Sequence, residues 1–205
     1  MSSASRRILI GGGARSGKSS FALDRARALG ERRVFVATAR ALDDEMRTRV
    51  ERHRLERAGA FATVEEDLDL PGALARLGGV TDPGPRPVAG SDSGSGEVAP
   101  APDVAVVDCL TLWLANLLLR GDAETEILAQ VDRLARVIEA PPCHLVLVSN
   151  EVGFGVVPDN ALGRAFRDLV GHAHQRVAPL CDELYLAALG TILRLRPEPV
   201  AVVPR

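Results

Sequence analysis

The feature that most constrains this chain is a glycine-rich stretch near its beginning, GGGARSGKSS at positions 11–20. Residues 12–19 match the pattern GxxxxGK[ST], in which backbone N–H groups, a helix N-terminus and one lysine surround phosphate groups. The context is the required one, because a short apolar run at 8–10 precedes the pattern and residues 19–29 carry apolar side chains at helical spacing. The sequence therefore predicts a strand, a phosphate-binding loop and a helix.

The lysine of this pattern, Lys18, is the only lysine among the 25 Lys and Arg residues of the chain. A planar guanidinium does not replace a compact ammonium at a tight phosphate site, which explains why lysine is kept here. We expect Lys18 to reach the terminal phosphates and Ser19 to offer its hydroxyl to Mg²⁺. The predicted nucleotide-binding residues of the loop are Gly12, Gly13, Ala14, Arg15, Ser16, Gly17, Lys18 and Ser19.

The rest of the chain predicts a P-loop NTPase-like α/β fold, a parallel sheet with helices on both faces. Further apolar runs at 34–37, 104–107, 145–148 and 184–189 are separated by helical segments. A length of 205 residues and 46% hydrophobic content fit one domain. Within it, the Gly-, Pro- and Ser-rich residues 78–103 are expected to be a disordered insertion, and 197–205 a peripheral strand or tail.

Composition excludes several classes of function. Arginines and acids are interspersed and the net charge is −2, which argues against nucleic-acid binding. The longest apolar stretch, 109–119, is about half of what a membrane span needs, so we expect no span and a cytoplasmic location. The three cysteines are far apart and lack a CxxC pair, which favours small buried side chains over disulfides or a zinc site.

Two further side chains are candidates for chemistry at the phosphates. Asp108 ends the apolar run 104–107, and it is either a magnesium or nucleotide ligand or a cap of the strand end. His53 shares a stripe with Met46 and Val50 on a long helix predicted over about 43–58. It is either a partly buried histidine bonded to a neighbour or an imidazole that attacks a phosphate and forms a phosphoramidate. Spacing alone does not choose.

A second glycine-containing loop, SNEVGFGVVP at 149–158, follows the strand predicted at 145–148. Ligands of open α/β sheets bind at the carboxyl ends of strands, so Asn150 and Glu151 are candidates for substrate contact. Downstream, His172 and His174 should point in different directions and not form a metal pair. A helix is predicted in this part of the chain, and five residues share one side of it: Arg164, Arg167, Asp168, Gly171 and Gln175. This side either binds an anion or is a stripe that faces solvent or another subunit.

Taken together, several motifs resemble the adenosylcobinamide kinase/adenosylcobinamide-phosphate guanylyltransferase family. They are GGARSGKS, VATA followed by DDEMxxRVxxHRxxR, TVE around Glu65, VVDCLTLWLANLL, and SNEVGxGVVPxNxLxRxFRDxxGxxxQ, and they span residues 8–195 apart from the insertion. The resemblance implies a P-loop domain, commonly a homotrimer, that phosphorylates adenosylcobinamide with ATP or GTP. It also implies that GMP passes from GTP, through a guanylylated histidine, to adenosylcobinamide phosphate, giving adenosylcobinamide-GDP.

The resemblance also assigns roles to residues. It places the guanylylated histidine at His53, and it implies a guanine nucleotide lined by Ala37, Thr38, Ala39, Arg54, Leu55, Glu56, Arg57, Glu65 and Asp108. His174 departs from the family pattern, which usually has asparagine there. Two other functions stay open: a different small-molecule P-loop kinase, which leaves His53 and the SNEVG loop unaccounted for, and a non-catalytic nucleotide-binding module.

Overall fold

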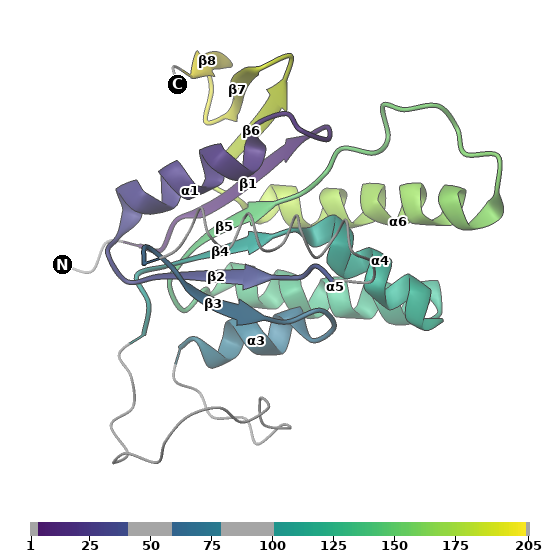
Figure 1. Ribbon diagram of the computed structural model, residues 1–205, viewed down its shortest axis with the longest axis horizontal. Helices are drawn as coiled ribbons and strands as arrows, with labels where there is room; N and C mark the ends of the chain where they lie inside the picture. The colour runs from purple at the N-terminus through teal and green to yellow at the C-terminus, as the bar shows by residue number, and fades with distance from the viewer. Residues whose placement is uncertain (1–3, 41–58, 79–100, 204–205) are drawn as a thin grey trace.

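The computed structural model describes residues 4–40, 59–78 and 101–203 (Figure 1). The predicted helix 43–58, most of the predicted insertion 78–103 and the last two residues therefore lie outside the described residues. In chain order, the elements are β1 Arg7–Gly12, α1 Lys18–Leu29, β2 Arg33–Ala37, β3 Ala62–Glu65, α3 Leu70–Arg76, β4 Val104–Asp108, α4 Leu110–Arg120, α5 Glu124–Glu139, β5 His144–Val148, α6 Ala161–Val177, the 3-10 turn η1 Ala178–Leu180, β6 Glu183–Ala188, β7 Thr191–Arg196 and β8 Ala201–Val203.

The strands form one eight-stranded sheet in the order β3-β2-β4-β5-β1-β6-β7-β8. Every pairing from β3 to β6 is parallel, which confirms the predicted parallel sheet for this part. The last two strands correct it, because β7 and β8 run antiparallel to their neighbours. The reversal occurs at Leu189 and Gly190, whose φ angles of 50° and 75° suit a two-residue hairpin turn. The C-terminal segment thus supplies β8, an edge strand.

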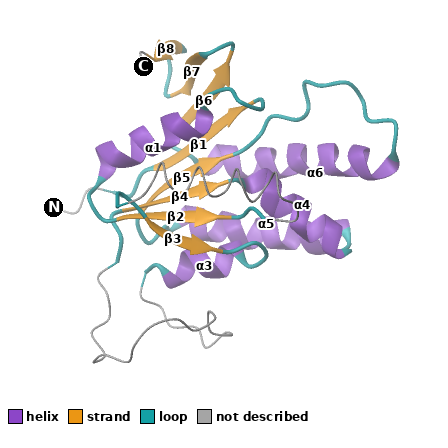
Figure 2. Cartoon of the chain, in the orientation of Figure 1, coloured by secondary structure: helices purple, strands orange, loops and turns teal. Residues whose placement is uncertain are grey.

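Helices cover both faces of the sheet, as predicted (Figure 2). Alternate residues of a strand point to opposite faces. Ile8 and Ile10 accordingly pack with Ala22 and Ala26 of α1, whereas Leu9 belongs to a second cluster that contains buried residues of α3, α4, α5 and α6. The centre of this second cluster includes Trp113, which is fully buried and whose Nε1 donates to Leu68 O at 2.8 Å. Two apolar layers therefore hold the parallel strands in place.

The three cysteines have the surroundings expected of them. Cys109, Cys143 and Cys181 are free and buried, which confirms them as small core side chains. Among the described residues, no helix is long and apolar enough to cross a membrane. Because six neighbouring strands are parallel, their carboxyl ends meet at one edge of the sheet, and this edge carries the residues considered next.

Candidate active site

The glycine-rich loop connects the predicted strand, β1, to the predicted helix, α1. Gly12 is the last residue of β1, with a φ of 153°, and a Cβ there would lie 2.5 Å from Ala187 O on the neighbouring strand. Gly17 precedes α1 with a φ of 91°, a left-handed conformation that favours glycine. The two glycines therefore permit the close approach to β6 and the turn into the helix.

Lys18 is the first residue of α1 and is 7% exposed. Its Nζ donates to Gly13 O at 3.0 Å, so the side chain folds back along the loop towards the residues expected to bind phosphate. Ser16 Oγ is buried and has no hydrogen-bond partner among the described residues. A buried hydroxyl without a partner is costly, and an oxygen of a bound phosphate would provide one. The outer loop residues Gly13, Ala14 and Arg15 are exposed, which leaves the loop accessible.

Three other predicted residues lie in one line across the sheet. Ala37, at the end of β2, is in register with Glu65 of β3 on one side and with Asp108 of β4 on the other. Asp108 and Ala37 are half-buried and Glu65 is exposed. The structure therefore brings these residues, distant in sequence, to the same carboxyl edge as the glycine-rich loop.

Cys109, a buried thiol, directly follows Asp108 in the chain. Burial, followed by the charge of Asp108, raises the pKa of Cys109 to about 11, and the charge of Lys18 acts in the opposite direction. The Ser19 hydroxyl and the Asp108 carboxylate carry hard oxygen atoms, the type of ligand that Mg²⁺ prefers. In the described part of the chain, no group of three or more His, Cys, Asp or Glu could hold a metal ion.

Thr38 and Ala39 follow β2 and have different surroundings. Ala39 is half-buried, but Thr38 is fully buried, and its hydroxyl both donates to Cys109 O and accepts from Cys109 N, each at 2.8 Å. Its carbonyl accepts from Asn116 Nδ2 at 2.8 Å. In this structure the Thr38 side chain therefore joins the ends of β2 and β4 and offers no surface to a nucleotide.

The residues after β5 are fixed to β1 by backbone hydrogen bonds. Ser149 N donates to Ile10 O and Glu151 N donates to Gly12 O, both at 3.0 Å. Asn150 turns inward, where its Nδ2 donates to Thr111 Oγ1 at 2.8 Å. The Glu151 side chain is 24% exposed, and its Oε1 accepts from Gly153 N at 2.8 Å. Of the two residues considered for substrate contact, Glu151 is thus the one with an accessible polar group beside the phosphate loop.

The two histidines of α6 point in different directions, as predicted. His174 Nε2 lies 2.7 Å from Ser149 Oγ, and its Nδ1 lies 3.7 Å from Glu151 Oε2. His172 Nδ1 is instead 3.6 Å from Glu124 Oε1 at the surface. Sequence reasoning missed the cluster of Ser149, Glu151 and His174, because 25 residues separate the serine from the histidine.

Two arginines of the stripe on α6 contact residues that are close to them in sequence. Arg164 Nη1 donates to the carbonyl oxygens of Pro158 and Asp159, both at 2.9 Å, and Arg167 Nη2 lies 3.0 Å from Asp168 Oδ1. These contacts favour the solvated stripe over an anion clamp. His53 and residues 54–57 lie outside the described residues, so their assignment stays a prediction.

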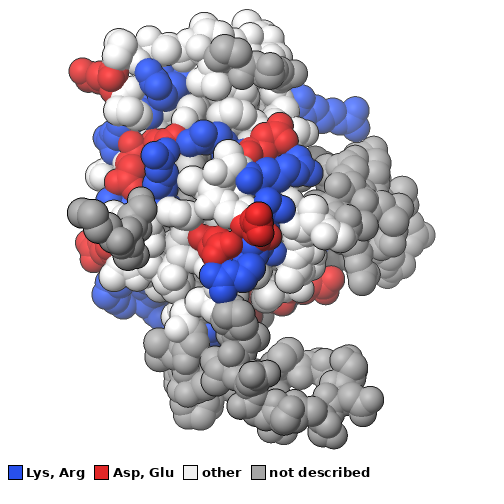
Figure 3. Space-filling model, turned by 90° about the vertical axis from the view of Figure 1, so that its left-hand side faces the viewer, with Lys and Arg blue, Asp and Glu red and all other residues white. Residues whose placement is uncertain are grey.

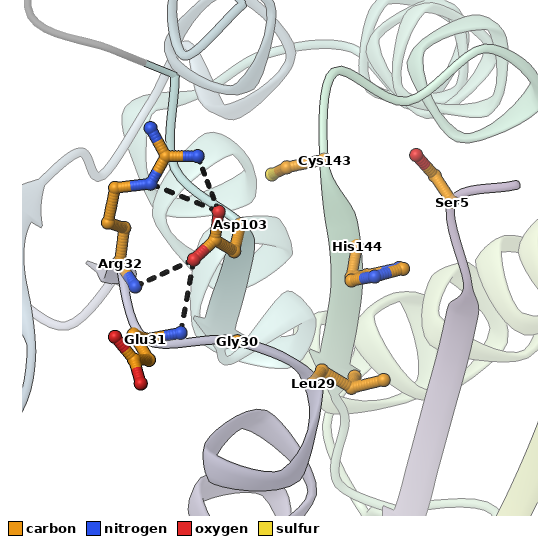
Figure 4. A pocket seen from close by; sticks show the side chains of 8 residues that line it. All are labelled: Ser5, Leu29, Gly30, Glu31, Arg32, Asp103, Cys143 and His144. Atoms are coloured by element: carbon orange, nitrogen blue, oxygen red, sulfur yellow. Dashed lines mark hydrogen bonds and ion pairs between the residues drawn. The ribbon is translucent and has the colours of Figure 1, made fainter. Parts of the chain in front are cut away.

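A hollow of about 560 Å³ lies at the opposite edge of the sheet, beside the amino ends of the strands (Figure 4). Its most polar group, Asp103, accepts from the backbone N–H groups of Glu31 and Arg32 and from the Arg32 guanidinium. The Arg32 hydrogen bonds lower the pKa of Asp103 to about 2. Figure 3 looks onto this edge, where basic and acidic side chains are interspersed. We interpret Asp103 as a structural residue that connects the segment before β2 to the start of β4, and not as part of a ligand site.

Comparison with known proteins shows which family the chain resembles. A sequence model described as cobinamide kinase / cobinamide phosphate guanyltransferase matches residues 8–82 and 94–195. The bifunctional adenosylcobalamin biosynthesis protein CobP of Pseudomonas aeruginosa is 36% identical over 194 residues, covering 95% of this chain and 99% of the relative. The corresponding proteins CobU of Escherichia coli and of Salmonella typhimurium are each 31% identical over 203 residues, covering 92% of this chain and 99% of theirs.

Among solved structures, the RadB recombinase gives a TM-score of 0.46 at 14% identity, covering 96% of this chain and 86% of that one. The family match and the relatives extend over the glycine-rich loop, the line of Ala37, Glu65 and Asp108, and the residues after β5. The chain therefore belongs to the cobinamide kinase / cobinamide phosphate guanyltransferase family.

Proposed function

We propose that this enzyme of adenosylcobalamin biosynthesis carries out both reactions of its family at a single nucleotide site, and that His53 is guanylylated in the second. The observation that supports the proposal is the arrangement at the carboxyl edge, where the glycine-rich loop with Lys18 follows β1 and Asp108 ends β4, with only β5 between the two strands. The first reaction phosphorylates the hydroxyl of the aminopropanol arm of adenosylcobinamide with ATP or GTP. The second gives adenosylcobinamide-GDP and pyrophosphate.

In the first reaction, the loop holds the triphosphate and Lys18 offsets the charge that develops on the leaving diphosphate. Ser19 and Asp108 are the residues that would hold Mg²⁺, which supplies further neutralisation of phosphate charge when bound. The unpartnered hydroxyl of Ser16 would donate to a phosphate oxygen. Each of these groups acts on the triphosphate, so none of them depends on which acceptor attacks.

In the second reaction, a neutral imidazole nitrogen of His53 attacks the α-phosphorus of GTP and pyrophosphate leaves. A phosphate oxygen of adenosylcobinamide phosphate then attacks the same phosphorus, and the bond to His53 breaks. Ala37, Ala39 and Glu65, at the ends of β2 and β3, are proposed to line the nucleotide together with residues 54–57. Covalent capture thus divides one transfer into two displacements.

Labelling with GTP that carries the label at the α-phosphate tests this function. We expect an acid-labile, base-stable adduct on the wild-type protein that is absent in His53→Ala and present in His172→Ala, a control histidine at the surface. His53→Ala should still phosphorylate adenosylcobinamide, whereas Lys18→Ala should lose both activities. Phosphate transfer without an adduct would instead indicate a plain kinase, and nucleotide binding without turnover a non-catalytic module.

The proposal includes the cytoplasmic location and the homotrimer that the family resemblance implies. Light scattering during size-exclusion chromatography measures the assembly directly. A mass of about 65 kDa, three times the chain mass of 21.8 kDa, is expected. A monomer mass at working concentration would contradict the homotrimer.

A further inference from the structure

The cluster after β5 contains a carboxylate that neither the motifs nor the family match assigns to a step. Glu151 lies three residues after the end of β5, which pairs with β1, and its backbone N–H is bonded to Gly12 O, so its backbone adjoins the start of the phosphate loop. The other neighbour of β1 is β6, whose last residues at this edge, Ala187 and Ala188, carry no titratable side chain. Asp108 lies one strand further from β1 than Glu151 does. Glu151 is thus the carboxylate on the strand extension that flanks the loop.

The rest of the cluster holds Glu151 in place. Gly153 N donates to Oε1, and His174 Nδ1 faces Oε2 at 3.7 Å, an electrostatic contact that is longer than a direct hydrogen bond. On the other side of the ring, His174 Nε2 shares a hydrogen bond with Ser149 Oγ at 2.7 Å, in which the tautomer of the ring decides which atom donates. The order Ser149, His174, Glu151 therefore runs from the core towards the loop.

This arrangement of serine, histidine and carboxylate is not a hydrolytic triad. Ser149 is fully buried, so its hydroxyl is not available to attack a substrate. The accessible end of the cluster is the carboxylate, with 24% of the Glu151 side chain and 21% of the His174 side chain exposed. We therefore interpret the cluster as a support for the Glu151 carboxylate, in which the buried Ser149 hydroxyl holds the ring of His174.

We propose that Glu151 is the general base of the phosphorylation reaction and that His174 is a positioning residue that holds its carboxylate. This inference rests on the proposed kinase function. The Glu151 carboxylate takes the proton of the substrate hydroxyl as that oxygen bonds to the γ-phosphorus, and the bond from the γ-phosphorus to the bridging oxygen breaks to release the nucleoside diphosphate. The proton later passes from Glu151 to solvent, to which the side chain is open.

The two reactions differ in their need for this base. An alcohol must lose a proton to attack, whereas the phosphate of adenosylcobinamide phosphate and a neutral imidazole already present a nucleophilic atom. Burial lowers the pKa of His174, so its ring is neutral at neutral pH and leaves the negative charge of Glu151 uncompensated.

The test is the variant Glu151→Gln, which keeps the size and shape of the side chain but cannot accept the proton of the substrate hydroxyl. We expect kcat for adenosylcobinamide phosphorylation to fall by about 10²–10⁴-fold with KM for ATP little changed, and the acidic limb of the pH profile to disappear. Formation of the adduct from α-labelled GTP should persist and shows that the variant is folded. Glu124→Gln is the matched control, because Glu124 of α5 is a surface carboxylate that faces His172 of α6, and this variant should behave as wild type.

Two histidine variants separate positioning from packing. His174→Asn places an amide where Nδ1 faces Glu151, whereas His174→Gln places it where Nε2 meets Ser149. Phosphorylation by His174→Asn should exceed that by His174→Gln by about tenfold or more, because a misplaced catalytic group loses rate steeply. Equal rates would show that His174 acts through packing alone.

A wild-type rate in Glu151→Gln, or an equal loss of both reactions, would overturn the assignment of the base. Failure of the wild-type protein to phosphorylate adenosylcobinamide would overturn the proposed kinase function itself, and the base with it. The same assays therefore distinguish the two failures.

Discussion

Replacement of Thr38 by valine would test whether this residue joins two strand ends or contacts a nucleotide. The hydroxyl of Thr38 makes two buried hydrogen bonds, each of 2.8 Å, to the N–H and C=O groups of Cys109. Valine fits the same volume but leaves Cys109 N without a partner at a fully buried position, whereas Cys109 O keeps the hydrogen bond from Trp113 N at 3.2 Å. Because Cys109 directly follows Asp108, the change also loosens the support of the candidate magnesium ligand.

The magnitude follows from these two bonds. The unsatisfied Cys109 N costs about 2 kcal/mol, the lost hydrogen bond to Cys109 O costs about 1 kcal/mol, and the added methyl group returns about 1 kcal/mol. The free energy of unfolding of Thr38→Val should therefore fall by about 2 kcal/mol. Thr38→Ser keeps both hydrogen bonds and loses one buried methyl group, which corresponds to about 1 kcal/mol.

Urea unfolding measures the difference. With an m-value of about 2 kcal/mol/M, the midpoint of Thr38→Val should lie about 1 M below that of wild type and that of Thr38→Ser about 0.5 M below. The order of the two variants is the decisive result. If Thr38→Val is as stable as Thr38→Ser and loses only nucleotide affinity, Thr38 is a binding residue and the structural reasoning is wrong.

Two further predictions concern the sheet around the loop. Tyr185 is the only tyrosine of the chain, and burial, followed by its hydrogen bond to Glu183, raises its pKa to about 12. An ultraviolet titration should thus show a midpoint near 12, with the stabilising effect complete below about pH 10 and lost as pH rises through the folded-state pKa; a midpoint near 10 would contradict the burial. Gly12→Ala should destabilise the fold by about 2–4 kcal/mol through its positive φ and the 2.5 Å approach to Ala187 O. Gly13→Ala, with nothing within 4 Å of the added Cβ, should change thermal stability little, and equal effects at both positions would refute the steric argument.

The central strands could be predicted from the sequence because each is an apolar run that is buried on both faces. The fully buried residues Val104–Val107 and Leu145–Val148 are examples. The edge strand β3 was missed because ATVE has one half-buried side chain in four residues and offers no such run. Helix α3 did leave a signal, since Asp69 caps it by accepting from Gly72 N and Pro71 stands in its first turn.

The candidate site was predictable to the extent that its residues are local in sequence. The loop and Lys18 belong to one motif, and the strand ending in Asp108 is a weak pattern that gained meaning from the fold. Contacts across the sheet have no such signal: Thr38 and Cys109 are 71 residues apart, and Ser149 and His174 are 25 apart. Their pairing depends on strand order and on how α6 packs, which periodicity does not encode.

One lysine is sufficient for two reactions because the same phosphates carry the leaving charge in both. Phosphorylation breaks the bond between the γ-phosphorus and the β-phosphate oxygen, and guanylylation breaks the bond between the α-phosphorus and the oxygen that leaves with pyrophosphate. In each reaction, negative charge develops on the β-phosphate, the group that a lysine folded along the loop is placed to offset. The two reactions then need different nucleophiles but not different loops. We propose that these come from different elements, with the alcohol activated beside β5 by Glu151 and the imidazole supplied by His53.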